Sequence, residues 1–220
     1  MNIQKSLDQF VTGNGKNKGR LSNERYASFD YCYNYFYSFY KDNKISKLAN
    51  QDNLQMSCLQ IGFYLASWGM MRGSSFLLEK SVRNFSDLII AISKMDSKLW
   101  EIDVSDYNSE NIVILLDCKK KIINALGKGN NPSDTLVTKI MLGVFSNVPA
   151  FDQYFRQSMS VYSFNRNSLF KIKEFYIGNK NILDSYNIHT LDFTKGVETD
   201  IIYNKAKLID MCCFMDGFNR

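Results

Sequence analysis

Three residues in the second half of this sequence are candidates for a catalytic role: Asp152 and the lysines Lys139 and Lys128. They lie in one stretch, residues 127–156, which reads GKGNNPSDTLVTKIMLGVFSNVPAFDQYFR. A carboxylate at the first turn of a helix is held by backbone N–H groups and stays ionised. Beside an extruded nucleotide, such an anion can stabilise the cationic sugar that develops as the base leaves, or align the attacking water. We therefore predict that Asp152 is a catalytic residue for glycosidic cleavage; the alternative is that it only caps the helix that begins beside Pro149.

The two lysines are candidates for an amine role in the same site. A nucleophilic lysine requires a desolvated or cationic neighbourhood, because only then does its pKa fall far enough to give the free amine. The apolar stripe of the helix predicted over residues 134–145 places Lys139 away from its centre, and Lys128 lies in the loop before that helix. The sequence therefore favours lysines that are solvated or contact phosphate, and it favours water as the nucleophile.

Glycine-containing segments supply candidate contacts to a nucleic-acid backbone. Gly127 and Gly129 belong to the loop that joins two predicted helices. Farther upstream, Arg72 lies beside a glycine, and Ser74 begins a new helical turn whose free N–H groups and positive dipole end can receive an anion. Arg156 adds another positive charge. We predict that these five residues bind DNA; the alternative for the upstream segment is an interrupted helix whose glycines allow close packing.

An aromatic-rich helix is predicted over residues 28–41, SFDYCYNYFYSFYK. A stripe at helical spacing predicts its buried face and comprises Phe29, Cys32, Tyr33, Phe36, Phe39 and Tyr40. Tyrosines off this stripe, Tyr31, Tyr35 and Tyr37, can stack on bases. Tyr35 and Trp68 are predicted to line the pocket for an extruded base. The alternative is that the helix belongs wholly to the core or to a partner interface.

Composition predicts an all-α protein that forms one globular multi-helix domain over residues 1–220, with two helical lobes around a cleft as a variant. The chain is 45% hydrophobic and 14% aromatic, which is enough for a sizeable core. Two prolines and no alternation of β-branched residues argue against a sandwich or barrel. Residues 13–20, GNGKNKGR, are predicted to form a flexible, basic and solvated loop. A net charge of +5 favours a polyanionic partner such as DNA.

Further helices are expected over residues 3–11, 53–71, 110–126, 168–177 and 179–186. The helix over residues 110–126 is predicted to begin at Asn108 or Ser109, and one over residues 85–94 at the N-cap Asn84. The C-terminal helix is predicted over residues 198–214. Residues 187–196 are predicted as a loop or a short extended piece.

The sequence lacks residues that several classes of protein require, and those classes are therefore not expected. One histidine, His189, is too little for a His-rich metal site or a Ser-His-Asp triad, and no Walker A or GxGxxG sequence is present. We expect no metal and no cofactor. Five cysteines, an odd number with no C-x-x-C motif, predict reduced thiols in a cytoplasmic protein. The longest apolar run, residues 59–71, is shorter than the roughly 20 residues that span a bilayer, so we expect no membrane partner.

The stretch around Asp152 resembles the helix-hairpin-helix DNA glycosylase superfamily. The resemblance covers Gly127-Lys128-Gly129, the helix predicted over residues 134–145, and Val148-Pro149-Ala150-Phe151-Asp152. It implies that the glycine hairpin grips DNA backbone and that Asp152 is the catalytic aspartate. The hairpin is not Leu-Pro-Gly-x-Gly, Gln153-Tyr154-Phe155 replaces the usual residues after the aspartate, and the four-cysteine cluster arrangement is missing. The expected function is a base-excising DNA N-glycosylase; the alternative is a non-catalytic helical module that binds nucleic acid or protein.

Overall fold

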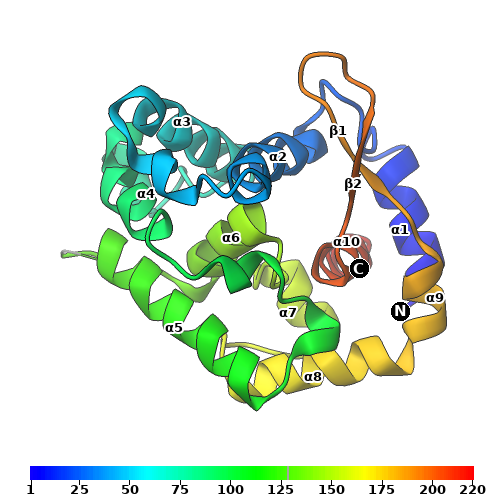
Figure 1. Ribbon diagram of the computed structural model, residues 1–220. Helices are drawn as coiled ribbons and strands as arrows, with labels where there is room; N and C mark the ends of the chain where they lie inside the picture. Colours follow the sequence, from blue (N-terminus) through cyan, green and yellow to red (C-terminus); the bar gives the residue numbers. More distant parts are fainter. Residues whose placement is uncertain (128) are drawn as a thin grey trace.

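The chain folds into ten α-helices and one two-stranded sheet within residues 1–127 and 129–220, the residues that this computed structural model describes (Figure 1). The helices are α1 Ile3–Thr12, α2 Ser28–Lys41, α3 Gln51–Ser67, α4 Ser86–Ile92, α5 Ser109–Leu126, α6 Asp134–Phe145, α7 Gln153–Met159, α8 Arg166–Gly178, α9 Lys180–Ser185 and α10 Lys205–Phe218. The strands are β1 His189–Leu191 and β2 Glu198–Ile202. Short 3-10 helices cover Arg25–Ala27, Ile45–Ala49, Phe76–Glu79, Val82–Phe85, Ser97–Trp100 and Val104–Asp106. The predicted all-α class is confirmed, apart from the small sheet.

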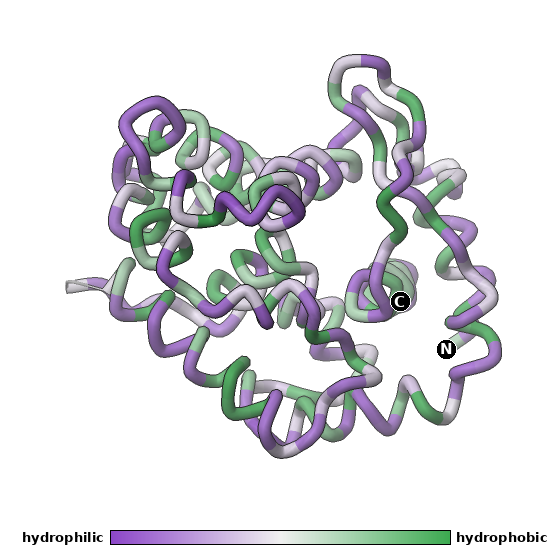
Figure 2. Tube along the Cα trace, in the orientation of Figure 1, coloured by the Kyte–Doolittle hydropathy of each residue, from purple (hydrophilic) through white to green (hydrophobic). Residues whose placement is uncertain are grey.

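Helix α6 occupies the centre of the core, because it is apolar on nearly every side. It packs against α2, α3 and α5, and all its residues from 136 to 145 are buried (Figure 1). Figure 2 shows α6 in mostly hydrophobic colours. A helix that is hydrophobic all round must be enclosed by other elements. The predicted position of Lys139 at the margin of a one-sided stripe is therefore wrong: Lys139 is buried with its neighbours.

Helices α7 and α1 pack against the second buried helix, α10. The buried residues of α10 run without a break from 206 to 215. Its N-terminus is fixed by the carboxylate of Asp103, which accepts hydrogen bonds from the backbone N–H groups of Lys205 and Ala206 at 2.7 and 2.9 Å. Residues of α6, α7 and α10 line one pocket, in which the predicted catalytic residues Asp152 and Lys139 lie.

Two of the expected helix boundaries are wrong. The predicted helix over residues 198–214 is divided, because residues 198–202 form β2 and α10 begins only at Lys205. Thr199 and Ile201 are β-branched and alternate in burial with their exposed neighbours, which is the pattern of a strand on a pleated surface. Near the other boundary, Asn84 lies inside a 3-10 helix, and α4 starts after it at Ser86.

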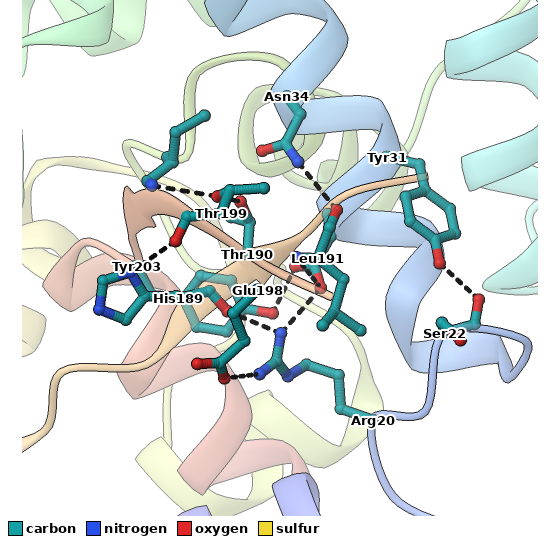
Figure 3. A network of polar contacts seen from close by, with 12 residues as sticks. Arg20, Ser22, Tyr31, Asn34, His189, Thr190, Leu191, Glu198, Thr199 and Tyr203 are labelled. Atoms are coloured by element: carbon teal, nitrogen blue, oxygen red, sulfur yellow. Dashed lines mark hydrogen bonds and ion pairs between the residues drawn. The ribbon is translucent and has the colours of Figure 1, made fainter. Parts of the chain in front are cut away.

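The antiparallel pair β1–β2 is held against α2 by a buried arginine from the N-terminal loop (Figure 3). The guanidinium of Arg20 donates to a carboxylate oxygen of Asp30 at 3.1 Å, to the carbonyl oxygen of His189 at 2.7 Å and to the carboxylate of Glu198 at 3.1 Å. Asp30 also accepts from the hydroxyl of Tyr203 and is fully buried. The prediction of a wholly solvated loop over residues 13–20 is therefore wrong at Arg20, which is 6% exposed.

Because Asp30 is buried, the unfolding free energy of the protein should depend on pH. Its burial raises the pKa from 3.8 to about 6, although the charge of Arg20 and the hydrogen bond from Tyr203 act in the opposite direction. Between pH 4 and 6 the unfolded chain therefore releases this proton while the folded chain retains it, so the folded state loses stability as pH rises. We expect the unfolding free energy of the wild type, relative to Asp30→Asn, to fall by up to about 3 kcal/mol from pH 4 to pH 7. Urea unfolding of both proteins at several pH values measures this difference. The same dependence of unfolding free energy on pH in both proteins would contradict the prediction.

Close packing of α6 on α3 leaves no room for a methyl group at Gly143. A Cβ there would lie 2.5 Å from a ring carbon of the buried Tyr64. We expect Gly143→Ala to destabilise the protein by about 1–3 kcal/mol through overpacking. The matched control is Gly178→Ala at the end of α8, where a Cβ meets no atom within 4 Å; there a small gain is expected, because alanine favours a helix. Thermal or urea unfolding measures both, and a neutral Gly143→Ala would show that the contact relaxes freely.

Candidate functional site

Asp152 is the N-cap residue of α7 and forms an ion pair with Lys139. One carboxylate oxygen accepts from the backbone N–H of Phe155 at 3.0 Å, and the other lies 3.2 Å from Nζ of Lys139. The side chains are 17% and 5% exposed, respectively, so the Asp152 side chain is more accessible to solvent than that of Lys139. The capping role and a partly accessible carboxylate therefore coexist in one residue.

The turn before Asp152 is held by side chains from two other helices. The backbone N–H of Ala150 donates to the carboxylate of Asp210 at 3.0 Å. The N–H of Phe151 donates to the hydroxyl of Thr138 at 2.8 Å, and the hydroxyl of Thr135 donates to the carbonyl oxygen of Phe151 at 2.8 Å. These bonds from α6 and α10 determine where the carboxylate of Asp152 lies, which is the preorganisation that an electrostatic catalyst requires.

Trp68, at the C-terminal end of α3, forms an aromatic wall beside the ion pair. Nζ of Lys139 lies 5.1 Å from the centre of the Trp68 ring, and Arg25 lies 5.2 Å from it. The ring of Tyr26 stacks on Trp68 with centroids 5.6 Å apart, and Phe214 of α10 meets it edge-on at 5.5 Å. The cations favour the electron-rich indole face, so this wall is rigid and surrounded by positive charge.

These residues line a pocket of about 390 Å³, which we call the Asp152 pocket. Besides Asp152, Lys139 and Trp68, its walls include three arginines, Arg25, Arg72 and Arg156, and the aromatic residues Tyr154, Phe214 and Phe218. Its size falls within the roughly 300–1,000 Å³ of small-molecule sites. Five of the predicted site residues therefore meet in one pocket: Asp152, Lys139, Trp68, Arg72 and Arg156.

The pocket carries an excess of positive charge. Within the described residues, none of Arg25, Arg72 and Arg156 has a carboxylate within salt-bridge distance; the only such pair among the charged groups of the pocket joins Lys139 to Asp152. Two buried N–H groups of the lining, Nε1 of Trp68 and Nε of Arg156, also have no hydrogen-bond acceptor among the described residues. Unpartnered cations and donors of this kind are matched by an anionic ligand.

Glycine at position 69 brings Arg72 into the pocket. Gly69 has a φ of 74°, and a Cβ there would lie 2.7 Å from Nε of Arg72. The arginine side chain therefore lies directly against this backbone, and the positive φ is a conformation that favours glycine. The alternative interpretation of this segment, an interrupted helix with close-packed glycines, describes the local structure correctly. It does not exclude binding, because the close approach is what places Arg72.

The remaining predicted residues lie outside this pocket. The hydroxyl of Tyr35 pairs with that of Ser57 at 2.9 Å, on the side of α2 that faces α3. Ser74 is exposed in the turn before a short 3-10 helix. Gly127 ends α5 and Gly129 follows it; neither lines the Asp152 pocket. Lys128 is not among the described residues.

Sequence reasoning missed two contributions to the site. Arg25 lies more than forty residues before Trp68 in sequence, and nothing in its local pattern connects the two. The other is a buried pair on α10, in which Nζ of Lys207 lies 3.0 Å from the carboxylate of Asp210 and 5.8 Å from the Trp68 ring. The placement of Lys207 and Asp210 three apart on a helix signals a pair, but only burial indicates that it supports the pocket.

Comparison of the chain with models of protein families, with curated proteins and with solved structures gave no match. Among the described residues, no helix is both long and apolar enough to cross a membrane. The same residues contain no group of three or more His, Cys, Asp or Glu side chains placed to hold a metal ion.

Proposed function

We propose that this protein binds DNA and hydrolyses an N-glycosidic bond of a nucleotide extruded into the Asp152 pocket. The observation that carries the proposal is the carboxylate of Asp152, which opens on an aromatic wall and on three arginines that have no carboxylate partner among the described residues. A nucleotide offers the complementary features: a flat base for the aromatic wall, a phosphate for the arginines, and a sugar between them.

In this proposal Asp152 acts on the sugar. As the base leaves, positive charge develops at the anomeric carbon, and a fixed carboxylate nearby stabilises it or aligns a water for attack. The hydrogen bond from the N–H of Phe155 and the ion pair with Lys139 hold that carboxylate in place before substrate binds. Little reorganisation is then needed when the charge forms.

Lys139 is better suited to position Asp152 than to attack the sugar. Its Nζ is already engaged, because it donates to Asp152 at 3.2 Å and lies 5.1 Å from the centre of the Trp68 ring. A nucleophilic amine would have to break this pair first. The geometry therefore supports hydrolysis by water, with an abasic site as the product and without cleavage of the strand.

The second candidate is nucleic-acid binding without catalysis. It is favoured by the observation that both carboxylate oxygens of Asp152 already have a partner, one in the helix cap and one in the ion pair. In that case the arginines bind phosphate and Asp152 has only a structural role. Both candidates predict an affinity for DNA that falls steeply with added salt, because phosphate binding releases counterions.

A panel of DNAs separates the two. Modified and undamaged duplexes and single strands are incubated with the protein and then treated with alkali, which cleaves the strand at abasic sites. Release of a base from any member by the wild type, and its loss in Asp152→Asn, supports hydrolysis. Salt-sensitive binding with no base release from any member would leave the non-catalytic candidate.

A further inference from the structure

A second hollow adjoins the Asp152 pocket and has a different character. It measures about 580 Å³ and lies between the start of α2, the C-terminal half of α3 and the loop that joins β1 to β2. Its walls include Tyr31, Phe63 and Phe193, and we call it the aromatic groove. Phe63 and Phe193 are 69% and 77% exposed, which is unusual for side chains of this size.

Arg25 lines both the Asp152 pocket and the aromatic groove. Consecutive nucleosides of a nucleic acid are joined by one phosphodiester, so a cation between two hollows can bind the phosphate that links their occupants. The acid in the groove, Glu24, is paired with Lys18 at 2.6 Å, which leaves the charge of Arg25 uncompensated there. The groove is therefore apolar and aromatic, with a positive charge on the side where it meets the pocket.

The hairpin that carries Phe193 is tied to α2 and to the N-terminal loop. Figure 3 shows Arg20 joining the β1–β2 hairpin to the N-terminal loop, and Asn34 of α2 donating to the carbonyl oxygen of Leu191 at 3.0 Å. The hydroxyl of Tyr31 donates to the carbonyl oxygen of Ser22, and its ring meets Phe193 edge-on with centroids 5.1 Å apart. An exposed aromatic ring held in this way loses little freedom when it stacks on a base.

From these features we infer that the aromatic groove binds the base of the nucleotide next to the extruded one, in single-stranded DNA. The inference rests on the proposed function, because the extruded nucleotide occupies the Asp152 pocket. Arg25 binds the phosphate between the two nucleotides, and Phe63 and Phe193 stack on the second base. Stacking of this kind tolerates any sequence, since every base has a π-face. The site therefore recognises a step of two nucleotides rather than a lone nucleotide.

Calorimetric titration with three unmodified ligands tests this: thymidine 5′-monophosphate, the dinucleotide pTpT and octathymidylate. One stacked base contributes about 1–3 kcal/mol, so we expect pTpT to bind roughly 5- to 150-fold more tightly than the mononucleotide. Phe63→Ala and Phe193→Ala should each remove much of that gain and leave the mononucleotide affinity unchanged. Arg25→Gln should weaken the binding of both the mononucleotide and pTpT. Because both phenylalanines are mostly exposed, their variants should fold normally.

The matched control is Tyr162→Ala, which removes an aromatic side chain that is 75% exposed and lines neither hollow. Equal affinities for pTpT and the mononucleotide, or phenylalanine variants that bind like the Tyr162 variant, would overturn the inference. So would a wild-type dimer in sedimentation that Phe63→Ala dissociates, because the groove would then join two copies of the chain.

The two experiments distinguish a wrong assignment of the aromatic groove from a wrong assignment of the glycosylase activity. If octathymidylate binding depends on both phenylalanines but no DNA of the panel loses a base, the groove is supported and the glycosylase is not. If bases are released and the phenylalanine variants bind and react like the wild type, the glycosylase is supported and the groove is overturned.

Discussion

Asp152→Asn should abolish most base release while the protein remains folded. General acid–base and electrostatic catalysis by one carboxylate typically contribute about 10²–10⁴-fold, so we expect a loss of that order in the single-turnover rate. Asparagine remains a good N-cap, but its single side-chain oxygen cannot serve both the N–H of Phe155 and the ammonium of Lys139. A loss of stability of about 1–3 kcal/mol is therefore expected as well.

The rate is measured at saturating protein on the DNA of the panel that loses its base fastest. Asp87→Asn serves as the matched control, because Asp87 lies in the first turn of α4 and lines neither the Asp152 pocket nor the aromatic groove. Lys139→Met should lower the rate less than Asp152→Asn, since it loosens the carboxylate without removing it. A folded Asp152→Asn protein with the wild-type rate would exclude Asp152 as the catalyst.

Arg20→Met should destabilise the whole protein more than any other substitution discussed here. It removes the cation from the fully buried Asp30, and it removes donors to His189 and Glu198 on the two strands. Breaking a buried ion pair from one side typically costs about 3–5 kcal/mol, because the remaining charge is left without a partner. We expect a loss of this size at pH 7 by urea unfolding, together with release of the β1–β2 hairpin in hydrogen exchange.

Two comparisons make this expectation specific to the buried charge. The loss should shrink toward pH 5, because Asp30 can then be neutralised by protonation, its pKa already being raised by burial. Adding Asp30→Asn to Arg20→Met should restore part of the stability for the same reason. Lys18→Met, which removes an exposed ion pair in the same loop, should have no measurable effect. A loss from Arg20→Met that is independent of pH would indicate that packing, and not charge, is responsible.

The helical class and the position of the helix start at Asp152 follow from the sequence alone. The spacing of Phe29, Cys32, Tyr33 and Phe36 predicted the buried face of α2. The cap sequences placed the start of α5 at Asn108 or Ser109, of which Asn108 is the N-cap, and placed Asp152 at the start of α7. These features depend on residues within one or two turns of each other, so a local pattern suffices to predict them. The helix predicted over residues 198–214 is wrong in its first part, because residues 198–202 have the β-branched alternation of a strand and pair with β1.

Which charges are buried, and which residues share a pocket, depends on contacts between elements far apart in the sequence. Lys139 is enclosed because α6 is surrounded by other helices, and Arg20 because a hairpin far along the chain closes over it. Arg25, Trp68 and Asp152 come from three separate segments, and no spacing in the sequence connects them. Long-range contacts of this kind arise from packing of whole elements, and packing depends on all the surfaces that meet rather than on any one stretch of residues.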